Sequence, residues 1–358
     1  IMRAIVRMGI PVNGKNIFPS NIAGLPTWFT IRTSKDGYTA RRDDSAILVA
    51  MNPNTAVDDA GKVPAGGICI YDDIVLTDQR YKASGFSESR DDITYIKVPV
   101  DALVSQSEVP ENLRDRVRNM VYVGVLARVI DIDLEALHFA LNVHFNNKER
   151  AVKPNMDIIR LSYNWAVEQG IASGPYRLEP MERTRGMIMM EGNAASALGA
   201  VFGGVTVLAW YPITPSTSLA DAAKDYLAAL RHDPQTGLAD YAIIQAEDEL
   251  AAIGMVVGAS WAGARAMTAT SGPGISLMAE FTGLAYFAEV PAVIWDVQRM
   301  GPSTGLPTRV SQGDVLFAYF LGHGDSRHPV LFPANLSEAF EFGWKAFDIA
   351  EYLQTPVS

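Results

Sequence analysis

The stretch AMTATSGPGISLMAEFTGLAYFAEVPAVIWDV, residues 266–297, decides the fold class. It starts with a short apolar run, turns through glycine and proline, and continues as a mostly apolar helical pattern from Ile275 to Phe287. A second apolar run, from Pro291 to Val297, follows. Short apolar runs that alternate with helices are typical of parallel strands buried on both faces. The stretch therefore predicts a strand–helix–strand unit, with strands at Ala266 to Thr270 and Pro291 to Val297.

The same alternation extends upstream to Asn193. The further elements that we expect are a helix at Asn193 to Phe202, a strand at Val205 to Ala209, a helix at Ser218 to Leu230, a strand at Tyr241 to Ala246 and a helix at Glu249 to Ala264. Ser216 or Thr217 is placed to cap the second of these helices. The whole pattern predicts a doubly wound parallel sheet, whose ligands bind beyond the carboxyl ends of the strands.

The first half of the chain has a mixed α/β pattern. Short apolar runs at Ala46 to Ala50, Gly67 to Tyr71 and Tyr95 to Val100 predict strands, and helical patterns run from Pro110 into the 120s and from Asp133 to Leu141. Between Lys153 and Arg185 the pattern weakens and glycine, serine, proline and charges gather. At 358 residues two units are expected. We predict a first domain at 1–170, a linker at 171–190 and a second domain at 191–358.

The composition excludes several classes of protein. Hydrophobic residues make up 48% and charged residues 20%, and the net charge is -10, so no basic face for nucleic acid is expected. The longest apolar runs, such as Ala251 to Val257, are far too short to cross a bilayer. The single cysteine, Cys69, excludes an iron–sulfur cluster or a thiolate zinc site built by this chain alone. The chain opens without a charged and apolar leader, which favours a cytoplasmic location.

Four loops at the predicted strand ends carry the least ordinary residues: Tyr211 to Thr217, Glu247 to Glu249, Thr270 to Gly274, and Arg299 to Thr304. In the first loop Pro212 and Pro215 restrict the backbone around Thr214, so its hydroxyl is held in place. A fixed hydroxyl suits a carboxylate or carbonyl oxygen. The alternative is a proline-rich strand exit that binds nothing.

The other three loops each allow a functional and a purely structural interpretation. Glu249 opens an apolar helix and is a candidate buried carboxylate, although acidic residues are common in first helical turns. The glycine-rich turn at Thr270 to Gly274 can bring backbone amides close to a ligand, or can be only a tight turn. Arg299 suits a carboxylate, or alternatively forms a salt bridge with Asp296 or Asp314.

Taken together, in this order and spacing, these segments resemble the 2-oxoacid:ferredoxin oxidoreductases. The chain looks like the subunit in which a γ-type domain precedes the α, or pyrimidine-binding, domain, as in the 2-oxoglutarate branch. Four segments carry the resemblance: the stretch Phe18 to Trp28 (FPSNIAGLPTW), Gly192 to Ala195 (GNAA), Tyr211 to Ser216 (YPITPS) and Arg299 to Thr308 (RMGPSTGLPT). The resemblance covers most of the chain.

The resemblance assigns roles to individual residues. Glu249 would hydrogen-bond the aminopyrimidine of thiamine diphosphate and favour the tautomer that activates the thiazolium carbon. Thr214 and Arg299, with Thr304 nearby, would hold the 1-carboxylate and oxo group of the substrate. The remaining cofactor-binding residues would be Tyr211, Pro212, Ile213, Ser271 and Gly272. No metal ligand is assigned to this chain.

The resemblance also implies partners. The chain begins after the point where the family's glycine-rich γ turn stands, and it lacks a GDG motif for magnesium and diphosphate as well as the domain that usually follows. We therefore expect a β-type subunit that shares thiamine diphosphate and Mg²⁺ with this chain and carries a [4Fe-4S] cluster. Coenzyme A is the expected co-substrate and ferredoxin the electron acceptor. The expected assembly is a dimer of αβ heterodimers, with no contact to nucleic acid or membrane.

Three alternatives remain open at this level. The substrate is either 2-oxoglutarate, or pyruvate or a mixed set of 2-oxoacids. If it is 2-oxoglutarate, its distal carboxylate needs a cation, and the candidates are Arg265, Arg309, Arg327, His328 or a residue of the partner. A noncatalytic assembly subunit would keep the fold without the chemistry. A dinucleotide-binding enzyme is disfavoured because no GxGxxG follows a predicted strand.

Overall fold

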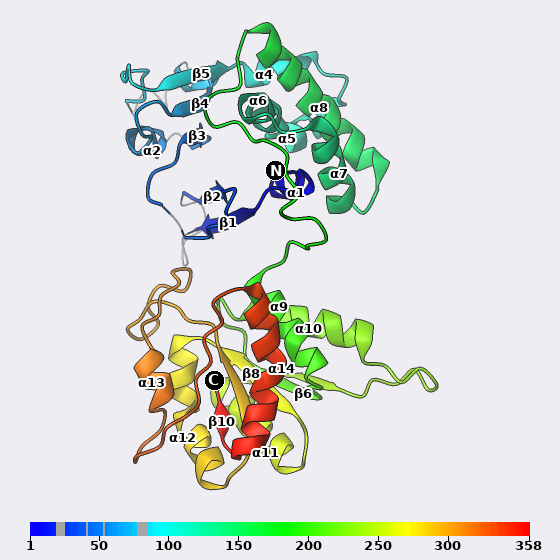
Figure 1. Cartoon of the computed structure of the whole chain (residues 1–358), viewed down its shortest axis with the longest axis vertical. Helices are drawn as coiled ribbons and strands as arrows, with labels where there is room; N and C mark the ends of the chain where they lie inside the picture. The colour runs from blue at the N-terminus through cyan, green and yellow to red at the C-terminus, as the bar shows by residue number, and fades with distance from the viewer. Residues whose placement is uncertain (19–25, 41, 53, 77–84) are drawn as a thin grey trace. The chain divides into compact units, whose positions relative to one another are not determined.

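The computed structural model describes residues 1–18, 26–40, 42–52, 54–76 and 85–358. The contacts within the chain divide it into two compact units, Ile1–Met189 and Met190–Ser358. Each unit has its own secondary structure (Figure 1), and each has its own core of buried apolar side chains. The motif segment Phe18 to Trp28 lies mostly outside the described residues.

The second unit is built on a five-stranded sheet in which every neighbouring pair is parallel, in the order β10-β9-β8-β6-β7. The strands are β6 (Val207–Trp210), β7 (Ala242–Gln245), β8 (Ala266–Thr270), β9 (Ala292–Asp296) and β10 (Pro356–Val357). Successive side chains of a strand point to opposite faces, and so Leu208 and Trp210 join one apolar core while Ala209 joins another. The predicted doubly wound sheet is confirmed.

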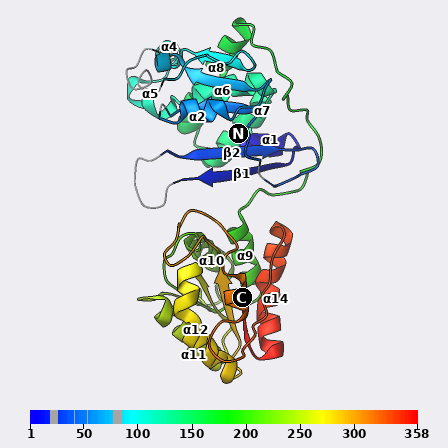
Figure 2. The ribbon, with the colours of Figure 1, turned by 90° about the vertical axis from the view of Figure 1, so that its left-hand side faces the viewer.

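Helices cover both faces of this sheet. They are α9 (Gly192–Phe202), α10 (Thr217–Leu230), α11 (Glu249–Trp261), α12 (Gly272–Phe287), α13 (Val315–Tyr319) and α14 (Leu336–Leu353). Figure 2 shows α14 on one side of the sheet and α11 with α12 on the other. The two buried clusters match this arrangement, because Phe347 of α14 belongs to the first and Ile253 of α11 to the second. The central strand β8 is accordingly buried along its whole length.

The strand order creates a switch point. From β6 the chain passes to β7 on one side, and α11 then carries it back across to β8 on the other side of β6. Loops that leave the carboxyl ends of β6 and β8 therefore diverge in opposite directions and leave a crevice between them. The unusual loops singled out from the sequence follow β6, β7, β8 and β9.

Two details of the predicted elements were wrong. Neither Ser216 nor Thr217 caps α10 with its side chain, because the Ser216 hydroxyl donates to the main-chain oxygen of Ile213 at 2.9 Å. Helix α12 begins at Gly272, not at Ile275. Proline is tolerated in a first helical turn, where its missing N–H has no intrahelical partner.

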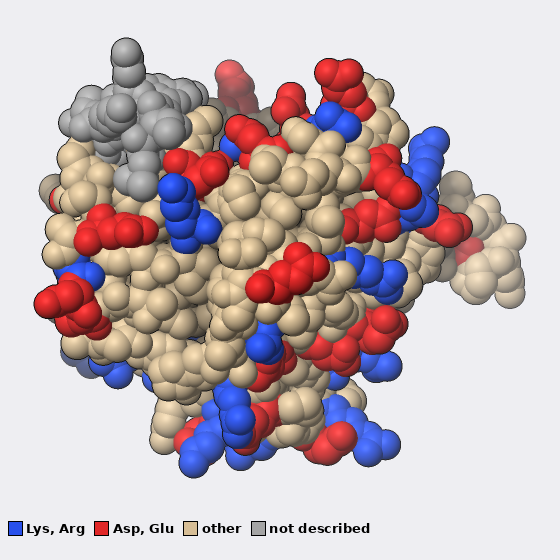
Figure 3. Space-filling view, turned by 90° about the horizontal axis from the view of Figure 1, so that it is seen from above, with Lys and Arg blue, Asp and Glu red and all other residues tan. Residues whose placement is uncertain are grey.

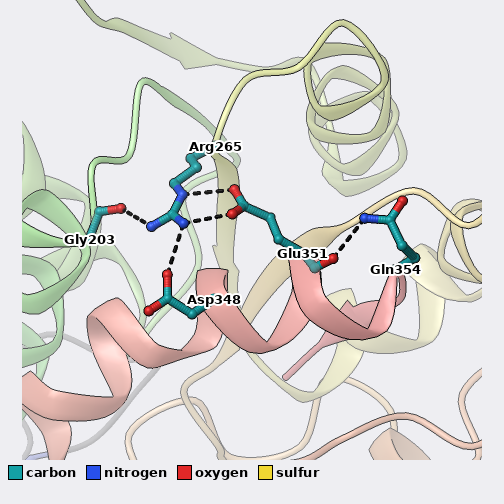
Figure 4. A network of polar contacts seen from close by, with 5 residues as sticks. All are labelled: Gly203, Arg265, Asp348, Glu351 and Gln354. Carbon is teal, nitrogen blue, oxygen red and sulfur yellow. Dashed lines mark hydrogen bonds and ion pairs between the residues drawn. The ribbon is translucent and has the colours of Figure 1, made fainter.

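Arg265, immediately before β8, ties α14 to the amino end of the sheet (Figure 4). Its guanidinium donates to both carboxylate oxygens of Glu351, at 2.7 and 2.6 Å, and to Asp348 at 2.8 Å. It also donates to the main-chain oxygen of Gly203, just after α9, at 2.6 Å. One side chain therefore joins a strand and two helices.

We predict that Arg265→Met lowers the free energy of unfolding of the second unit by about 1 to 2 kcal/mol, because several charge-assisted hydrogen bonds of a partly exposed guanidinium are lost together. Lys345→Met is the control, since Lys345 makes a single ion pair with Glu341 on the same helix and should cost less than about 0.5 kcal/mol. Urea unfolding of both variants measures the difference. Equal losses would show that the Arg265 network adds nothing beyond an ordinary surface pair.

The first unit contains two separate sheets. An antiparallel pair consists of β1 (Val12–Ile17) and β2 (Trp28–Thr33), and a parallel three-stranded sheet has the order β3-β4-β5. The strands of the parallel sheet, β3 (Ile47–Ala50), β4 (Ile68–Asp72) and β5 (Thr94–Val98), confirm the three predicted apolar runs. The central strand β4 is buried along its whole length.

The helices of the first unit are α1 (Met2–Arg7), α2 (Ala56–Gly61), the 3₁₀ turn η1 (Asp73–Leu76), α4 (Val100–Gln106), α5 (Glu111–Val117), α6 (Met120–Ile130), α7 (Leu134–His144) and α8 (Glu149–Glu168). The expectation that structure weakens after Lys153 was wrong for α8. This helix contains Pro154, and Asn155 donates its side-chain amide to Ala151 O at 2.7 Å. Tertiary packing against α6 outweighs the poor local pattern.

The segment predicted as a linker hydrogen-bonds to the first unit along much of its length. The amides of Gly174 and Leu178 donate to Val129 O and Ile130 O at 3.1 and 2.8 Å, and Met181 N donates to Met8 O at 2.9 Å. These main-chain bonds explain why the contacts assign residues up to Met189 to that unit.

Surface charges are mixed in sign. On the face of the molecule in Figure 3 acidic and basic side chains are interspersed between uncharged ones. Among the helices that the structure describes, none has both the length and the apolar character needed to cross a lipid bilayer.

Candidate functional site

Arg299 joins two of the loops at the carboxyl edge of the second unit's sheet. It lies just after β9 and is only 6% exposed. Its Nη1 donates to the main-chain oxygen of Thr214 at 2.8 Å, and its Nη2 to that of Thr304 at 2.9 Å. The three residues predicted to bind the substrate are therefore brought together. The alternative salt bridge from Arg299 to Asp296 or Asp314 is not formed, and the two hydrogen bonds of the guanidinium go to carbonyl oxygens instead.

The loop after β6 presents Thr214 at the surface of this site. The Thr214–Pro215 peptide bond is cis, and Thr214 is exposed while Ser216 is fully buried. The Thr214 carbonyl is used by Arg299, which leaves the hydroxyl accessible. The preceding residues of the motif, Tyr211, Pro212 and Ile213, run along the same edge, and Ile213 O accepts from Ser216 N at 2.8 Å.

Glu249 is the other buried charge of the site. It opens α11 and is 7% exposed, while the preceding Asp248 caps the helix by accepting from Ala251 N at 2.7 Å. Burial lowers the pKa of the Arg299 guanidinium, and the Glu249 carboxylate acts in the opposite direction. The two side chains therefore lie within electrostatic reach of one another. Glu247 in the same loop is exposed, so Glu249 is the candidate for a buried catalytic carboxyl group.

The turn after β8 presses against Glu249. A Cβ added to Gly274 would lie 1.9 Å from Thr270 Oγ1 and 3.0 Å from Glu249 Cγ, so only glycine fits. The hydroxyls of Thr270 and Ser271 are buried without a hydrogen-bond partner in the described structure. Buried hydroxyls normally find a partner. A carboxyl group and two unpaired hydroxyls can hydrogen-bond a polar ring, and a glycine turn lets such a ring approach the main chain.

Two carboxyl groups that the sequence did not single out as a pair lie beside these loops. Burial raises the pKa of Asp296 to about 8, and the charge of Asp314 and a hydrogen bond to it act in the same direction. Gln298 donates its side-chain amide to Asp314 Oδ1. A Cβ on Gly272 would lie 3.7 Å from Asp314 Oδ2 and 3.9 Å from Arg299 Cγ, so the pair borders the site.

The structure narrows the candidates for a distal cation. Arg265 lies at the opposite, amino end of the strands with its donors engaged (Figure 4). His328 is 2% exposed, its Nε2 lies 2.8 Å from Leu321 O, and burial lowers its pKa. Both are therefore structural residues. Arg327 is exposed, whereas Arg309 lies on the Arg299 loop, where Met300 N donates to its carbonyl at 2.7 Å.

Among the residues that the structure describes, there is no group of three or more His, Cys, Asp or Glu side chains arranged to hold a metal ion. The site therefore consists of buried charges, hydroxyls and glycine turns at the sheet edge.

We predict that Gly274→Ala lowers the free energy of unfolding of the second unit by about 1 to 3 kcal/mol, because the new methyl group overlaps Thr270 and displaces Glu249. Gly272→Ala is the control in the same turn. Its nearest neighbours would be 3.7 Å away, so its cost should stay below about 1 kcal/mol. Thermal unfolding compares the two, and an equal effect would refute the close approach at Gly274.

Two family models match this chain. The thiamine diphosphate-binding pyruvate flavodoxin/ferredoxin oxidoreductase model matches residues 198–358. The pyruvate ferredoxin/flavodoxin oxidoreductase model matches residues 1–165. The two matches fall in the second and first structural units respectively.

Curated relatives agree with these models. The chain is 33% identical, over 99% of its length, to the α subunit of 2-oxoacid:ferredoxin oxidoreductase 1 of Sulfurisphaera tokodaii and covers 60% of that relative. It is 48% identical to the 2-oxoglutarate synthase subunit KorA of Methanocaldococcus jannaschii, over 47% of this chain and 43% of the relative. The chain therefore spans about three fifths of the length of the first of these relatives.

A solved structure shares the fold. It is that of 2-oxoglutarate:ferredoxin oxidoreductase from Magnetococcus marinus, with 2-oxoglutarate, coenzyme A and succinyl-CoA bound. The TM-score is 0.85 at 32% identity, and the match covers 99% of this chain and 59% of the other.

Proposed function

Since the chain belongs to the 2-oxoacid:ferredoxin oxidoreductase family, we propose that it is the γ-fused α subunit of a 2-oxoglutarate:ferredoxin oxidoreductase. The reaction would convert 2-oxoglutarate and coenzyme A to succinyl-CoA and CO₂. The two electrons released would go one at a time, through the enzyme's cluster, to two ferredoxins, and the thiol proton would be released. The same balance allows the reverse carboxylation.

The observation that carries this proposal is the buried Glu249 carboxyl group at the sheet's switch point, with Arg299 within electrostatic reach. The residues around it fit thiamine diphosphate. The glycine turn at Gly272 to Gly274 brings main chain close to Glu249, and the Thr270 and Ser271 hydroxyls lack partners that a polar ring could supply. We propose that Glu249, Ser271 and Gly272, with the Tyr211, Pro212 and Ile213 backbone, hold the aminopyrimidine.

Glu249 would act on a proton. Its carboxyl group, held at the first turn of α11, is placed to share a hydrogen with a ring nitrogen of the aminopyrimidine and so select the ring's reactive tautomer. Bound thiamine diphosphate supplies the carbon nucleophile for the 2-oxo group. Burial of Glu249 excludes water that would otherwise compete for this hydrogen bond.

Arg299 and Thr214 would orient the substrate. The Arg299 guanidinium has five N–H groups, and the two bonds to Thr214 O and Thr304 O leave further donors. In its buried position the cation attracts a carboxylate more strongly than an exposed one would. The accessible Thr214 hydroxyl is placed to add a hydrogen bond to the same carboxylate or to the oxo group. Thr304 would act through its carbonyl, by holding Arg299.

A partner subunit would complete the active site. We propose a β-type partner that holds Mg²⁺, the diphosphate and a [4Fe-4S] cluster, in an assembly of two αβ units. The α-subunit names of the relatives support a heteromeric enzyme. Coenzyme A as co-substrate is supported by its presence in the Magnetococcus marinus structure.

The substrate assignment has one specific competitor. The relative with 48% identity and the solved structure both carry 2-oxoglutarate in their names, which supports 2-oxoglutarate. Relatives that match over 99% of this chain are named for 2-oxoacids in general, which supports a broader enzyme that also accepts pyruvate. Arg309, on the Arg299 loop, is the chain's own candidate for a second carboxylate.

We expect the chain, co-purified with its β-type partner, to reduce a low-potential viologen when given thiamine diphosphate, Mg²⁺, coenzyme A and 2-oxoglutarate. The rate with pyruvate should be lower by at least about tenfold, because a site that pairs a distal carboxylate leaves a buried cation unpaired with pyruvate. Equal rates would favour the broader enzyme. A cluster-loaded complex that turns over no 2-oxoacid would favour a noncatalytic assembly subunit.

We further predict that Glu249→Gln lowers kcat of this complex by about 100-fold or more, because the amide cannot exchange the required proton. Glu247→Gln is the matched control, since Glu247 is exposed in the same loop, and its kcat should change by less than about twofold. Gel filtration checks that both variants assemble. Unchanged turnover in Glu249→Gln would remove Glu249 from the catalytic role.

A further inference from the structure

Helices α11 and α12 form a layer over one face of the second unit's sheet, and the outer side of this layer is apolar. The two helices pack along one another (Figure 2), and a Cβ added to Gly254 of α11 would lie 3.2 Å from the Phe281 ring of α12. Their inner sides join the buried core through Ile253 and Met278. Six large apolar side chains, which we call the α11–α12 face, remain exposed on the outer side: Leu250, Met255, Trp261, Leu277, Leu284 and Phe287.

This face lacks the charges that a helix surface in contact with water normally carries. The two helices, ELAAIGMVVGASW and GPGISLMAEFTGLAYF, contain two charged residues, of which Glu249 is buried and Glu280 is exposed. By contrast, α10 of the same unit exposes Asp221, Lys224 and Asp225. A helix that is apolar on every side is normally buried on every side. We therefore expect the α11–α12 face to be covered in the assembled protein.

The size of the face suits a protein partner. Trp261 is 65% and Phe287 89% exposed, so these two side chains alone leave roughly 300 Å² of mainly apolar surface uncovered. The other four residues extend the patch to the upper end of the roughly 300 to 600 Å² that the largest patch of a typical monomer reaches. A stable protein interface buries about 800 Å² on each partner, with its polar rim included. The face can therefore serve as the apolar centre of such an interface.

Gly258 lies on the exposed side of α11, and nothing in the described chain requires a glycine there. A Cβ at this position would have no heavy atom within 4 Å, and the backbone is not in the left-handed region. Glycine inside a helix is destabilising relative to alanine or leucine. A helix surface that faces water gains nothing from this residue, whereas a partner main chain that approaches closely needs the space.

The position of the face identifies what covers it. Helix α11 begins with Glu249 and α12 with the Gly272 turn, so both helices start at the candidate cofactor site. Leu250 and Leu277, in the first two turns of these helices, begin the face at that end. A β-type partner that holds the diphosphate of the same cofactor molecule must reach this end of both helices. The apolar face is continuous with that contact.

We propose that the α11–α12 face is the docking surface for the β-type partner, which covers it with a mostly apolar helix. This inference rests on the proposed function, because that function supplies the partner and the shared cofactor. Gly258 lets the partner helix approach the main chain of α11, while Met255 and Trp261 pack on either side of it. The contact that joins the two chains then also closes the Glu249 end of the site.

Photo-crosslinking in the assembled complex identifies the chain that covers the face. With p-benzoylphenylalanine in place of Leu284, and the chain co-purified with its β-type partner, irradiation should join the two chains. The same change at Leu238, an exposed leucine between α10 and β7, should give no such product. Mass spectrometry identifies the joined peptides. A crosslink from position 284 to a second copy of this chain, a crosslink within the chain, or no crosslink would overturn the proposal.

A substitution at Gly258 distinguishes a docking surface from a solvated one. Gly258→Leu should raise the unfolding temperature of the chain purified without its partner, because leucine favours a helix and its Cβ meets no neighbour. It should raise the Kd of the complex at least about tenfold, because the side chain occupies the space of the partner main chain. Ala228→Leu, at an exposed position of α10, is the control and should change Kd by less than about twofold. An unchanged Kd in Gly258→Leu would contradict the proposal.

Viologen reduction by the same complexes separates this inference from the proposed function. In Gly258→Leu the specific activity should be low in dilute protein and recover at concentrations above the raised Kd, because association and not chemistry is impaired. A wild-type complex that turns over a 2-oxoacid without a crosslink from position 284 to the partner would overturn the docking surface alone. A wild-type chain that forms no complex with a β-type partner would overturn the proposed function and the docking surface with it.

Discussion

Two hydrogen bonds from one buried guanidinium hold the edge of the second unit's sheet together. Arg299 bonds to the main-chain oxygens of Thr214 and Thr304, which lie in loops after different strands. A carbonyl oxygen is a neutral acceptor, so the positive charge is fixed in place without being cancelled. A buried cation of this kind is unfavourable unless something negative approaches it. The buried guanidinium therefore favours the binding of an anion at the crevice between β6 and β8.

Other polar groups at the carboxyl ends of the strands are also buried without being fully hydrogen-bonded. Glu249 is buried at the start of α11, and the hydroxyls of Thr270 and Ser271 and one oxygen each of Asp296 and Asp314 are buried without a partner among the described residues. Each would be unfavourable in an ordinary core, where buried polar groups are satisfied. Their concentration at a single sheet edge is what separates a binding site from a hydrophobic core.

The opposite edge of the sheet has the reverse character. There Arg265 satisfies its donors with Glu351, Asp348 and Gly203 O, and so holds α14 and α9 on the strands. The glycines at the α9–α14 contact let the two helices approach closely, since a Cβ on Gly199 would lie 2.0 Å from Phe340 O. The amino end thus holds the helices on the strands, and the unpaired groups at the carboxyl end are supported by that framework.

The sequence by itself determined the alternation of strands and helices from 192 onward, because short apolar runs such as Ala292 to Trp295, set between helical patterns, have few other stable placements. It also identified the loops that carry Thr214, Glu249 and Arg299, since proline, glycine and buried charge are local features. It missed α8, whose helix forms through packing against α6 in spite of Pro154. Only the tertiary structure decided which acceptors Arg299 uses, that Arg265 lies at the far end of the strands, and that Gln298 bonds to Asp314. The physical reason is that hydrogen bonds and charge interactions depend on distances of a few ångströms between residues far apart in the chain, which periodicity does not encode.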